Sequence, residues 1–297
     1  MNPRERGFLL LTSHLGNPDR KPLTVPQLRT LADRMRQMPK PVEDRDLQWQ
    51  DFLALGYNRE MAERICCLLQ EEDLLDHYLH RANRAGCIPV TRVSEEYPLI
   101  LRQRLGLDSP GCLWVRGDKN LLNTPGISLV GSRDLRSLNR DFAREVGRQA
   151  ALQGLTLVSG NARGADRTAQ ESCLQAGGTV ISVVADELSK QPLRDNVLYV
   201  SEDDFEAEFS AQRALSRNRV IHALGRMVFV AQSDLGKGGT WDGTVKNLRF
   251  GWSPVACFRD GSEAMTQLEQ MGAYLISKED VQDFGILPET EMTFFDR

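Results

Sequence analysis

The sequence predicts an α/β protein in which a doubly wound, mostly parallel sheet follows a small helical domain. Three features of the 297 residues support this fold. From residue 126 onward, short apolar segments recur without the alternation of a half-exposed strand. Stretches of roughly 10–15 residues with helical spacing separate them. The first hundred residues show helical spacing alone. Strands without alternation are buried on both faces, as in a parallel sheet that helices cover.

The first hundred residues contain several segments with helical spacing. In the earliest of them Leu28, Leu31 and Met35 share one face, and Pro39 ends the helix. The expected helices span residues 25–38, 48–55, 59–69 and 72–85. We assign residues 1–95 to a helical N-terminal module and expect it to serve as an interaction or docking unit.

Glycines bound the elements of the predicted sheet domain. Gly126 and Gly131 enclose the first strand, and Gly154 ends the helix that follows it. The expected strands span residues 126–131, 155–159, 179–184, 197–201, 227–231, 254–258 and 273–276. The expected helices cover residues 142–150, 166–176, 211–224, 239–250 and 263–271. This alternation predicts a Rossmann-like domain over residues 96–280, followed by an acidic tail, residues 281–297.

The formal net charge of −4 averages over an uneven distribution of charge. Residues 1–100 carry 14 Lys and Arg against 15 Asp and Glu, whereas residues 101–259 carry 21 against 17. Residues 260–297 carry 2 against 9. The predicted sheet domain is therefore mildly basic within an acidic chain. Arg outnumbers Lys 30 to 7. Arg binds phosphate and carboxylate in a bidentate manner, although a GC-rich genome produces the same bias.

Several classes of protein are disfavoured by the composition. No apolar segment approaches the ~20 residues that a membrane-spanning helix needs. The N-terminal apolar run, residues 8–11, is too short for the core of a signal peptide. The six cysteines form neither a CxxC pair nor a Cys/His cluster, so we expect reduced thiols, no zinc and a cytoplasmic location. We also expect no cofactor, because the glycine-rich turns match neither GxGxxG nor GxxxxGK[ST].

Ligands of doubly wound sheets bind at the carboxyl ends of strands, so the residues that follow the predicted strands are candidate site residues. Gly131, Ser132 and Arg133 follow the first strand. The glycine permits a tight turn, and exposed backbone N–H groups together with an arginine suit an anion. The alternative is a structural turn that carries a surface arginine.

The segment SGNARGAD, at the end of the second strand, is the next candidate. Gly160 and Gly164 flank Arg163, which suits the close approach of a ligand, and Ser159 ends the strand. Asp166 is placed either to cap the following helix or to take part in chemistry.

A basic segment follows an acidic one further along the chain. Residues 213–226 carry four arginines and no acid, directly after five acids between residues 202 and 208. Arg213 and Arg217 are i,i+4 neighbours near the start of a predicted helix, where the helix dipole disfavours cations. Such a charge run is often a solvated face, but this placement favours an anion that docks there.

The last candidate is a glycine-rich turn between a strand and a helix. It contains Lys237, Gly238, Gly239 and Thr240. Glycines and a lysine at the start of a helix suit a phosphate, and the absence of the full Walker pattern means that no NTPase is implied.

Catalytic constellations are poor in this sequence. The four histidines lie outside the strand ends, except for His222 on the arginine-bearing helix. No GxSxG elbow, HExxH motif or close carboxylate pair is present. We therefore expect a site that binds phosphates and no enzyme.

The four strand-end segments, in this order, resemble the DprA/Smf family of DNA-processing proteins. The similarity runs from about Tyr97 to Ser277 and includes ISLVGSR, VSGNARGAD and SRNRVI. It also includes the closing segment GSEAMTQLEQMGAYLIS. The chain resembles a divergent member, because no winged helix follows Ser277 and Gln170 stands where the family has histidine.

The resemblance implies a single-stranded DNA-binding protein that acts in DNA uptake (transformation) or recombination. It also implies self-association, as a homodimer, and a RecA-type recombinase as partner. The residues that would contact the DNA backbone or shape the pocket are Gly131, Ser132, Arg133, Ser159, Gly160, Arg163, Gly164, Arg217, Asn218, Arg219, Lys237, Gly238, Gly239 and Thr240.

An alternative function stays open. The Gly-Gly-Thr stretch also resembles the LOG family, whose members cleave nucleoside monophosphates. That family pairs this stretch with a catalytic Arg and Glu, and no Glu follows soon after Thr240 here. A protein that binds or senses a small nucleotide without cleaving it is therefore the second hypothesis.

Overall fold

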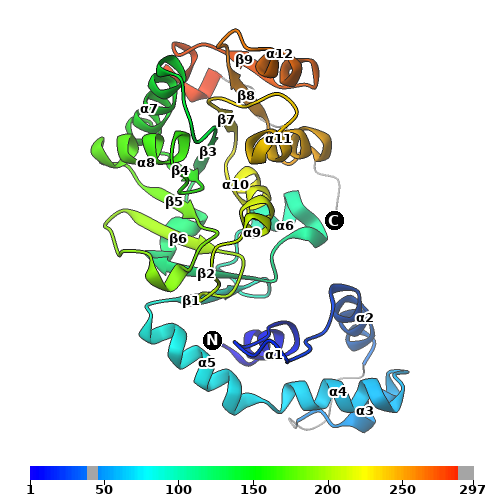
Figure 1. The fold of residues 1–297 in the computed structure, drawn as a ribbon. Helices are drawn as coiled ribbons and strands as arrows, with labels where there is room; N and C mark the ends of the chain where they lie inside the picture. The colour runs from blue at the N-terminus through cyan, green and yellow to red at the C-terminus, as the bar shows by residue number, and fades with distance from the viewer. Residues whose placement is uncertain (39–45, 287–297) are drawn as a thin grey trace. The chain divides into compact units, whose positions relative to one another are not determined.

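The computed structural model describes residues 1–38 and 46–286 (Figure 1). The chain forms two compact units, of which the first comprises Met1–Ala85 and Val93–Glu95. The second comprises Gly86–Arg92 and Glu96–Arg297. Two expectations reach outside the described residues: the end of the first helix at Pro39, and the part of the acidic tail beyond residue 286.

The first unit is helical, as the spacing of its apolar residues predicts. Its helices are α1 (Pro3–Thr12), α2 (Val25–Arg36), α3 (Trp49–Ala54), α4 (Arg59–Leu69) and α5 (Glu72–Arg84). Helix α1 was not expected. It starts with Pro3 in its first turn and with a capping box in which the side chains of Asn2 and Glu5 each accept from the other's backbone N–H.

One buried arginine, Arg20, contacts the ends of two helices of the first unit. The guanidinium of Arg20 forms an ion pair with Glu71, with 2.6 Å between Nε and Oε2. It also donates hydrogen bonds to the carbonyl oxygens of Leu10 and Ser13. Because those carbonyls lie at the end of α1 and Glu71 immediately precedes α5, Arg20 joins both helices to the loop that follows α1.

The second unit is built on a nine-stranded sheet in the order β1-β2-β6-β5-β4-β3-β7-β8-β9. Its strands are β1 (Ile88–Thr91), β2 (Cys112–Gly117), β3 (Gly126–Val130), β4 (Thr156–Ser159), β5 (Val180–Val183), β6 (Val197–Ser201), β7 (Val228–Val230), β8 (Val255–Phe258) and β9 (Tyr274–Ile276). From β6 to β9 all neighbours are parallel, whereas β2 is antiparallel to β6 and to β1. The predicted α/β fold with a mostly parallel sheet is confirmed, and the seven strands expected from residue 126 onward agree to within one residue at each end.

Helices cover both faces of this sheet (Figure 1). They are α6 (Leu99–Leu105), α7 (Ser137–Leu152), α8 (Ala165–Gln175), α9 (Ala211–Ser216), α10 (Asn218–Leu224), α11 (Gly238–Phe250) and α12 (Glu263–Gln270). Helices α7 and α8 lie on one face and α6, α10 and α11 on the other. Strands β3 and β6 are buried along their whole length, which explains why their residues do not alternate in polarity.

Three elements that the sequence did not indicate precede β3: β1, α6 and β2. Strand β1 is an edge strand with Pro89 inside it, and Ile88 is 44% exposed. Proline is tolerated at a sheet edge but weakens a strand pattern, so this segment carries little signal in the sequence.

Candidate functional site

The order of the strands reverses beside β3. The chain proceeds from β3 outward through β4, β5 and β6, and then returns to build β7, β8 and β9 on the other side. The carboxyl ends of β3 and β7 therefore lie next to each other at the switch point, where doubly wound sheets bind ligands. Each of the four predicted segments of the site has residues at or beside this point.

The loop after β3 is tightly packed and presents one arginine. A Cβ atom on Gly131 would lie 2.6 Å from the Cβ of Ala165, so only glycine fits there. The carbonyl of Ser132 accepts from the N–H of Ala165 at 3.1 Å, and the N–H of Ser132 donates to the carbonyl of Gln232 at 2.9 Å. These bonds join the loop to the start of α8 and the end of β7. Arg133 is left exposed to solvent.

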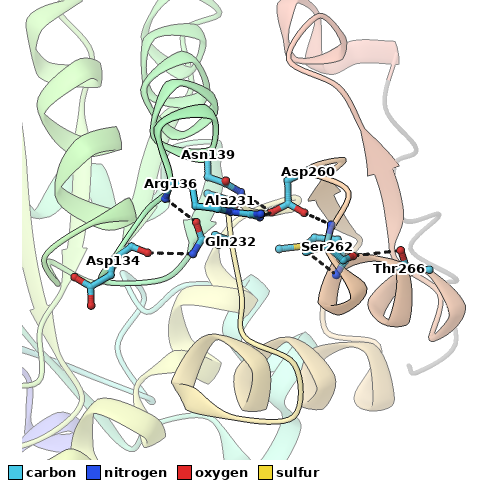
Figure 2. A network of polar contacts seen from close by, with 9 residues as sticks. Asp134, Arg136, Asn139, Ala231, Gln232, Asp260, Ser262 and Thr266 are labelled. Carbon is cyan, nitrogen blue, oxygen red and sulfur yellow. Dashed lines mark hydrogen bonds and ion pairs between the residues drawn. The ribbon is translucent and has the colours of Figure 1, made fainter.

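The side chain of Gln232 holds the same loop at two further points (Figure 2). Its Oε1 accepts from the N–H of Arg136, and its Nε2 donates to the carbonyl of Asp134, both at 3.0 Å. The preceding carbonyl, that of Ala231, accepts from Nδ2 of Asn139 at 2.7 Å. One amide side chain thus fixes the backbone between Arg133 and the start of α7.

A buried carboxylate completes this network from the end of β8 (Figure 2). The carboxylate of Asp260 is 1% exposed, accepts from Nδ2 of Asn139 at 2.6 Å and forms an ion pair with Arg136. Burial raises the pKa of Asp260, but hydrogen bonds from Ser262 and Asn139 and the charge of Arg136 outweigh this, so its pKa lies below the ordinary value. Asp260 therefore stays ionised and anchors the start of α7.

The loop after β4 packs directly on the loop after β3. Gly164 has φ +88°, and a Cβ atom there would lie 2.4 Å from the carbonyl oxygen of Ser132. Arg163, just before it, is 74% exposed and pairs with Asp134, with 2.6 Å between Nη2 and Oδ1. Arg133 and Arg163 therefore emerge from two loops that are in contact.

Arg217 is buried beneath the second loop. Its Nη2 donates to the carbonyl of Gly160 at 2.8 Å, and a Cβ atom on Gly160 would lie 1.9 Å from Nη1 of the same guanidinium. The neighbouring carboxylate of Asp166 is also buried and accepts from the N–H of Ala162 at 3.1 Å. Burial lowers the pKa of Arg217 and raises that of Asp166, while each charge opposes the shift of the other. Asp166 thus stabilises the loop after β4. It does not supply the N-cap of α8, which is Gly164.

The single helix expected over residues 211–224 is wrong in one respect, because it is broken at Arg217. Helix α9 ends and α10 begins at this residue. Its guanidinium reaches back to β4, and Nδ2 of the next residue, Asn218, donates to the carbonyl of Gly239 at 3.1 Å. Both are long-range contacts, which the spacing of apolar residues does not reveal.

The preceding acidic segment neutralises part of the predicted arginine cluster. Arg219 forms an ion pair with Glu202, with 2.6 Å between Nη2 and Oε2, and Nε of Arg213 lies 3.6 Å from Oδ2 of Asp203. Arg226 immediately precedes Met227 and β7, so it lies at the opposite end of the sheet from the switch point. Of the four arginines in this run, Arg226 therefore lies away from the switch point, and Arg213 and Arg219 are paired with acids.

The glycine-rich turn after β7 starts α11. Lys237 occupies the N-cap position and is exposed, and Gly238 has φ +86°. No side chain caps the first turn, which contains Gly239 and the half-buried Thr240. The bond from Asn218 to Gly239 joins this turn to α10.

These contacts unite the four segments that the sequence predicts. The outward-facing cations are Arg133, Arg163 and Lys237, whereas Arg217 and Ser159 are buried and Arg219 is 27% exposed. Gln232, Asn139 and Asp260 position the site and were missed. Gln232 directly follows one predicted strand, and Asp260 lies two residues beyond another, so the sequence could have indicated both.

Three observations concern metal binding, membrane spans and the buried histidine in the described part of the chain. No group of three or more His, Cys, Asp and Glu side chains there is placed to hold a metal ion. None of its helices is long and apolar enough to cross a membrane. His222 is buried, and burial and the charge of Arg217 lower its pKa to about 3, so it is neutral at physiological pH.

The fold and the site together define a class of protein. It is a doubly wound, Rossmann-like α/β protein whose switch point is surrounded by glycine-rich turns and by arginine and lysine side chains. The model of the DNA recombination-mediator protein A family matches residues 89–284, more than half of the chain. The chain belongs to this family, which is the DprA/Smf family.

Individual relatives agree with this assignment. Protein Smf of Escherichia coli is 28% identical over 195 residues, which cover 62% of this chain and 48% of that protein. The DNA processing protein DprA of Streptococcus pneumoniae is 30% identical over 187 residues, covering 57% of this chain and 64% of that protein. The chain thus matches between about half and two thirds of the length of these relatives.

Solved structures show the same fold. The crystal structure of DprA from S. pneumoniae superposes with a TM-score of 0.70 at 24% identity, covering 95% of this chain and 98% of that one. The DNA processing protein A of Helicobacter pylori superposes with a TM-score of 0.55 at 24% identity, covering 67% and 93%.

Proposed function

We propose that the chain binds single-stranded DNA by its phosphate backbone at the switch point of the sheet. The observation that carries this proposal is that Arg133 and Arg163 emerge from contacting loops, the second of which also contacts the buried guanidinium of Arg217 through Gly160. Exposed arginines on a fixed backbone suit phosphate oxygens, which accept bidentate hydrogen bonds.

The second support comes from a relative. The H. pylori protein that shares this fold has been described in a single-stranded DNA-binding mode.

In the present chain the ion pair between Arg163 and Asp134 is exposed on both sides, at 74% and 84%. Exposed pairs contribute about 0–1 kcal/mol, so a phosphate displaces Asp134 at little cost.

The proposal extends to the role and the partners of the protein. The chain acts as a non-enzymatic binder in DNA uptake or recombination, in the cytoplasm, as a homodimer and with a RecA-type recombinase as partner. Membership of the DprA/Smf family supports each of these points. Light scattering on a size-exclusion column tests the dimer, and pull-down with purified recombinase tests the partner.

The binding proposal is tested by fluorescence anisotropy with a labelled single strand and a duplex of the same sequence. We expect the wild type to bind the single strand more tightly, and Arg133→Ala combined with Lys237→Ala to weaken binding at least ten-fold. Arg144→Ala serves as control, since Arg144 is an exposed, ion-paired arginine on α7. If the wild type binds neither DNA at low salt, the proposal is wrong.

A further inference from the structure

A hollow lies on the segment that joins β6 to α10. It has a volume of about 670 Å³, and the residues lining it include Phe209, Gln212, Arg213 and Ser216. Small-molecule sites typically span roughly 300–1,000 Å³. Ser216 connects the hollow to a candidate site residue, Arg219, because its Oγ accepts a hydrogen bond from Nη1 of Arg219 at 2.9 Å.

The wall of this hollow carries an aromatic ring that faces solvent. Phe209 is 59% exposed. The next residue, Ser210, caps α9 by accepting from the N–H of Arg213 at 3.1 Å, so the ring sits directly before a fixed helix start. An exposed ring beside the proposed DNA-binding site offers a surface on which a base can stack.

The charges in the hollow disfavour a phosphate. Nε of Arg213 lies 3.6 Å from Oδ2 of Asp203, and its Nη1 donates to the carbonyl of Glu208. The carboxylates of Asp203, 37% exposed, and of Glu208 also line the hollow. A carboxylate repels phosphate and accepts hydrogen bonds, so these groups select an uncharged ligand that carries N–H donors.

We propose that this hollow is a nucleobase subsite, in which a base stacks on Phe209 and donates its exocyclic amine to the carboxylate of Asp203 or Glu208. The proposal rests on the proposed single-stranded DNA binding and adds a base preference to it. Cytosine, adenine and guanine carry an exocyclic amine, whereas thymine carries none. The chain therefore binds cytosine-rich strands more tightly than thymine-rich strands.

The test compares the affinities for labelled oligo-dC and oligo-dT of about 12 nucleotides, a length within the range of single-strand binding sites. We expect the wild type to bind oligo-dC at least about five-fold more tightly than oligo-dT. Asp203→Ala combined with Glu208→Ala removes both acceptor side chains, so it abolishes this preference and retains the binding of oligo-dT.

The aromatic ring is tested separately. Phe209→Ala weakens the binding of both strands at least about five-fold, and Phe209→Trp restores it, because tryptophan also stacks. Phe250→Ala is the matched control, since Phe250 is 60% exposed on α11 and does not line the hollow. It leaves both affinities unchanged.

The outcomes separate the two proposals. Equal affinity of the wild type for both strands, or equal affinities of the Phe209→Ala and Phe250→Ala variants, overturns the subsite and leaves backbone binding in place. Failure of the wild type to bind either strand at low salt overturns both proposals.

Discussion

The guanidinium of Arg217 lies against the backbone of Gly160, donating from Nη2 to its carbonyl oxygen at 2.8 Å. This contact joins the loop after β4 to the break between α9 and α10. It places a buried positive charge against the loop that carries Arg163, which we propose to be a phosphate contact together with Arg133.

We expect Gly160→Ala to disturb this contact. The added Cβ atom would lie 1.9 Å from Nη1 of Arg217, so the guanidinium must move and its bond to Gly160 is lost. Overpacking of this kind costs about 1–3 kcal/mol of stability, and DNA affinity falls with it. Urea unfolding and anisotropy measure both effects.

Gly7→Ala is the control for this substitution. Gly7 lies in α1, and the nearest atom to an added Cβ is 3.9 Å away, on Leu69. Alanine favours the helix over glycine, so this variant is as stable as the wild type or more so. If Gly160→Ala matches Gly7→Ala in stability and DNA affinity, the guanidinium of Arg217 does not pack against Gly160.

Gln232 is expected to affect binding without contacting DNA. Gln232→Ala removes two hydrogen bonds at 3.0 Å, to Arg136 and Asp134, and so frees the loop that carries Arg133. We expect a loss of DNA affinity of about three- to ten-fold, because an ordering cost of roughly 1 kcal/mol then accompanies binding. Anisotropy measures the affinity, and an unchanged value would show that the loop is rigid without Gln232.

Stability is expected to depend on pH through His222. Its folded-state pKa of about 3 lies below the ordinary value of 6.5, because burial and the charge of Arg217 disfavour the imidazolium. As the pH falls, His222 therefore takes up its proton at a higher pH in the unfolded chain than in the folded protein. The contribution of His222 to stability is complete above pH 6.5 and is lost as the pH falls toward 3, by up to about 1.4 kcal/mol per pH unit.

Urea midpoints between pH 4 and pH 8 test this dependence. His222→Gln should flatten the decline in stability below pH 6.5, whereas the same change at the exposed His14 should leave it as in the wild type. Parallel curves for wild type and His222→Gln would contradict the assignment.

The sheet and the strand-end loops could be predicted because their signals are local. Glycine-bounded apolar segments define β3 and β4, and the turns that follow them carry Arg133 and Arg163 in the residues next to the strands. Parallel topology then brings these turns to one edge of the sheet.

The remainder depends on long-range contacts. The pairing of Arg219 with Glu202 and the burial of Arg217 under Gly160 join residues 17 and 57 positions apart. A charge run in the sequence does not show which of its members are already neutralised. The helix break at Arg217 has the same origin, since a buried guanidinium and Asn218 fix the backbone from outside the helix.

The most direct test of the central claim is the salt dependence of oligo-dT binding. For a single strand, the logarithm of the affinity falls against the logarithm of the salt concentration with a slope of about −0.7 per neutralised phosphate. We expect Arg133→Ala/Arg163→Ala to make the slope less negative by about 1.4, and Arg144→Ala/Arg148→Ala, on the outer face of α7, to leave it unchanged. A wild-type affinity that does not vary with salt, or a double variant with the wild-type slope, would contradict backbone binding at the switch point of the sheet.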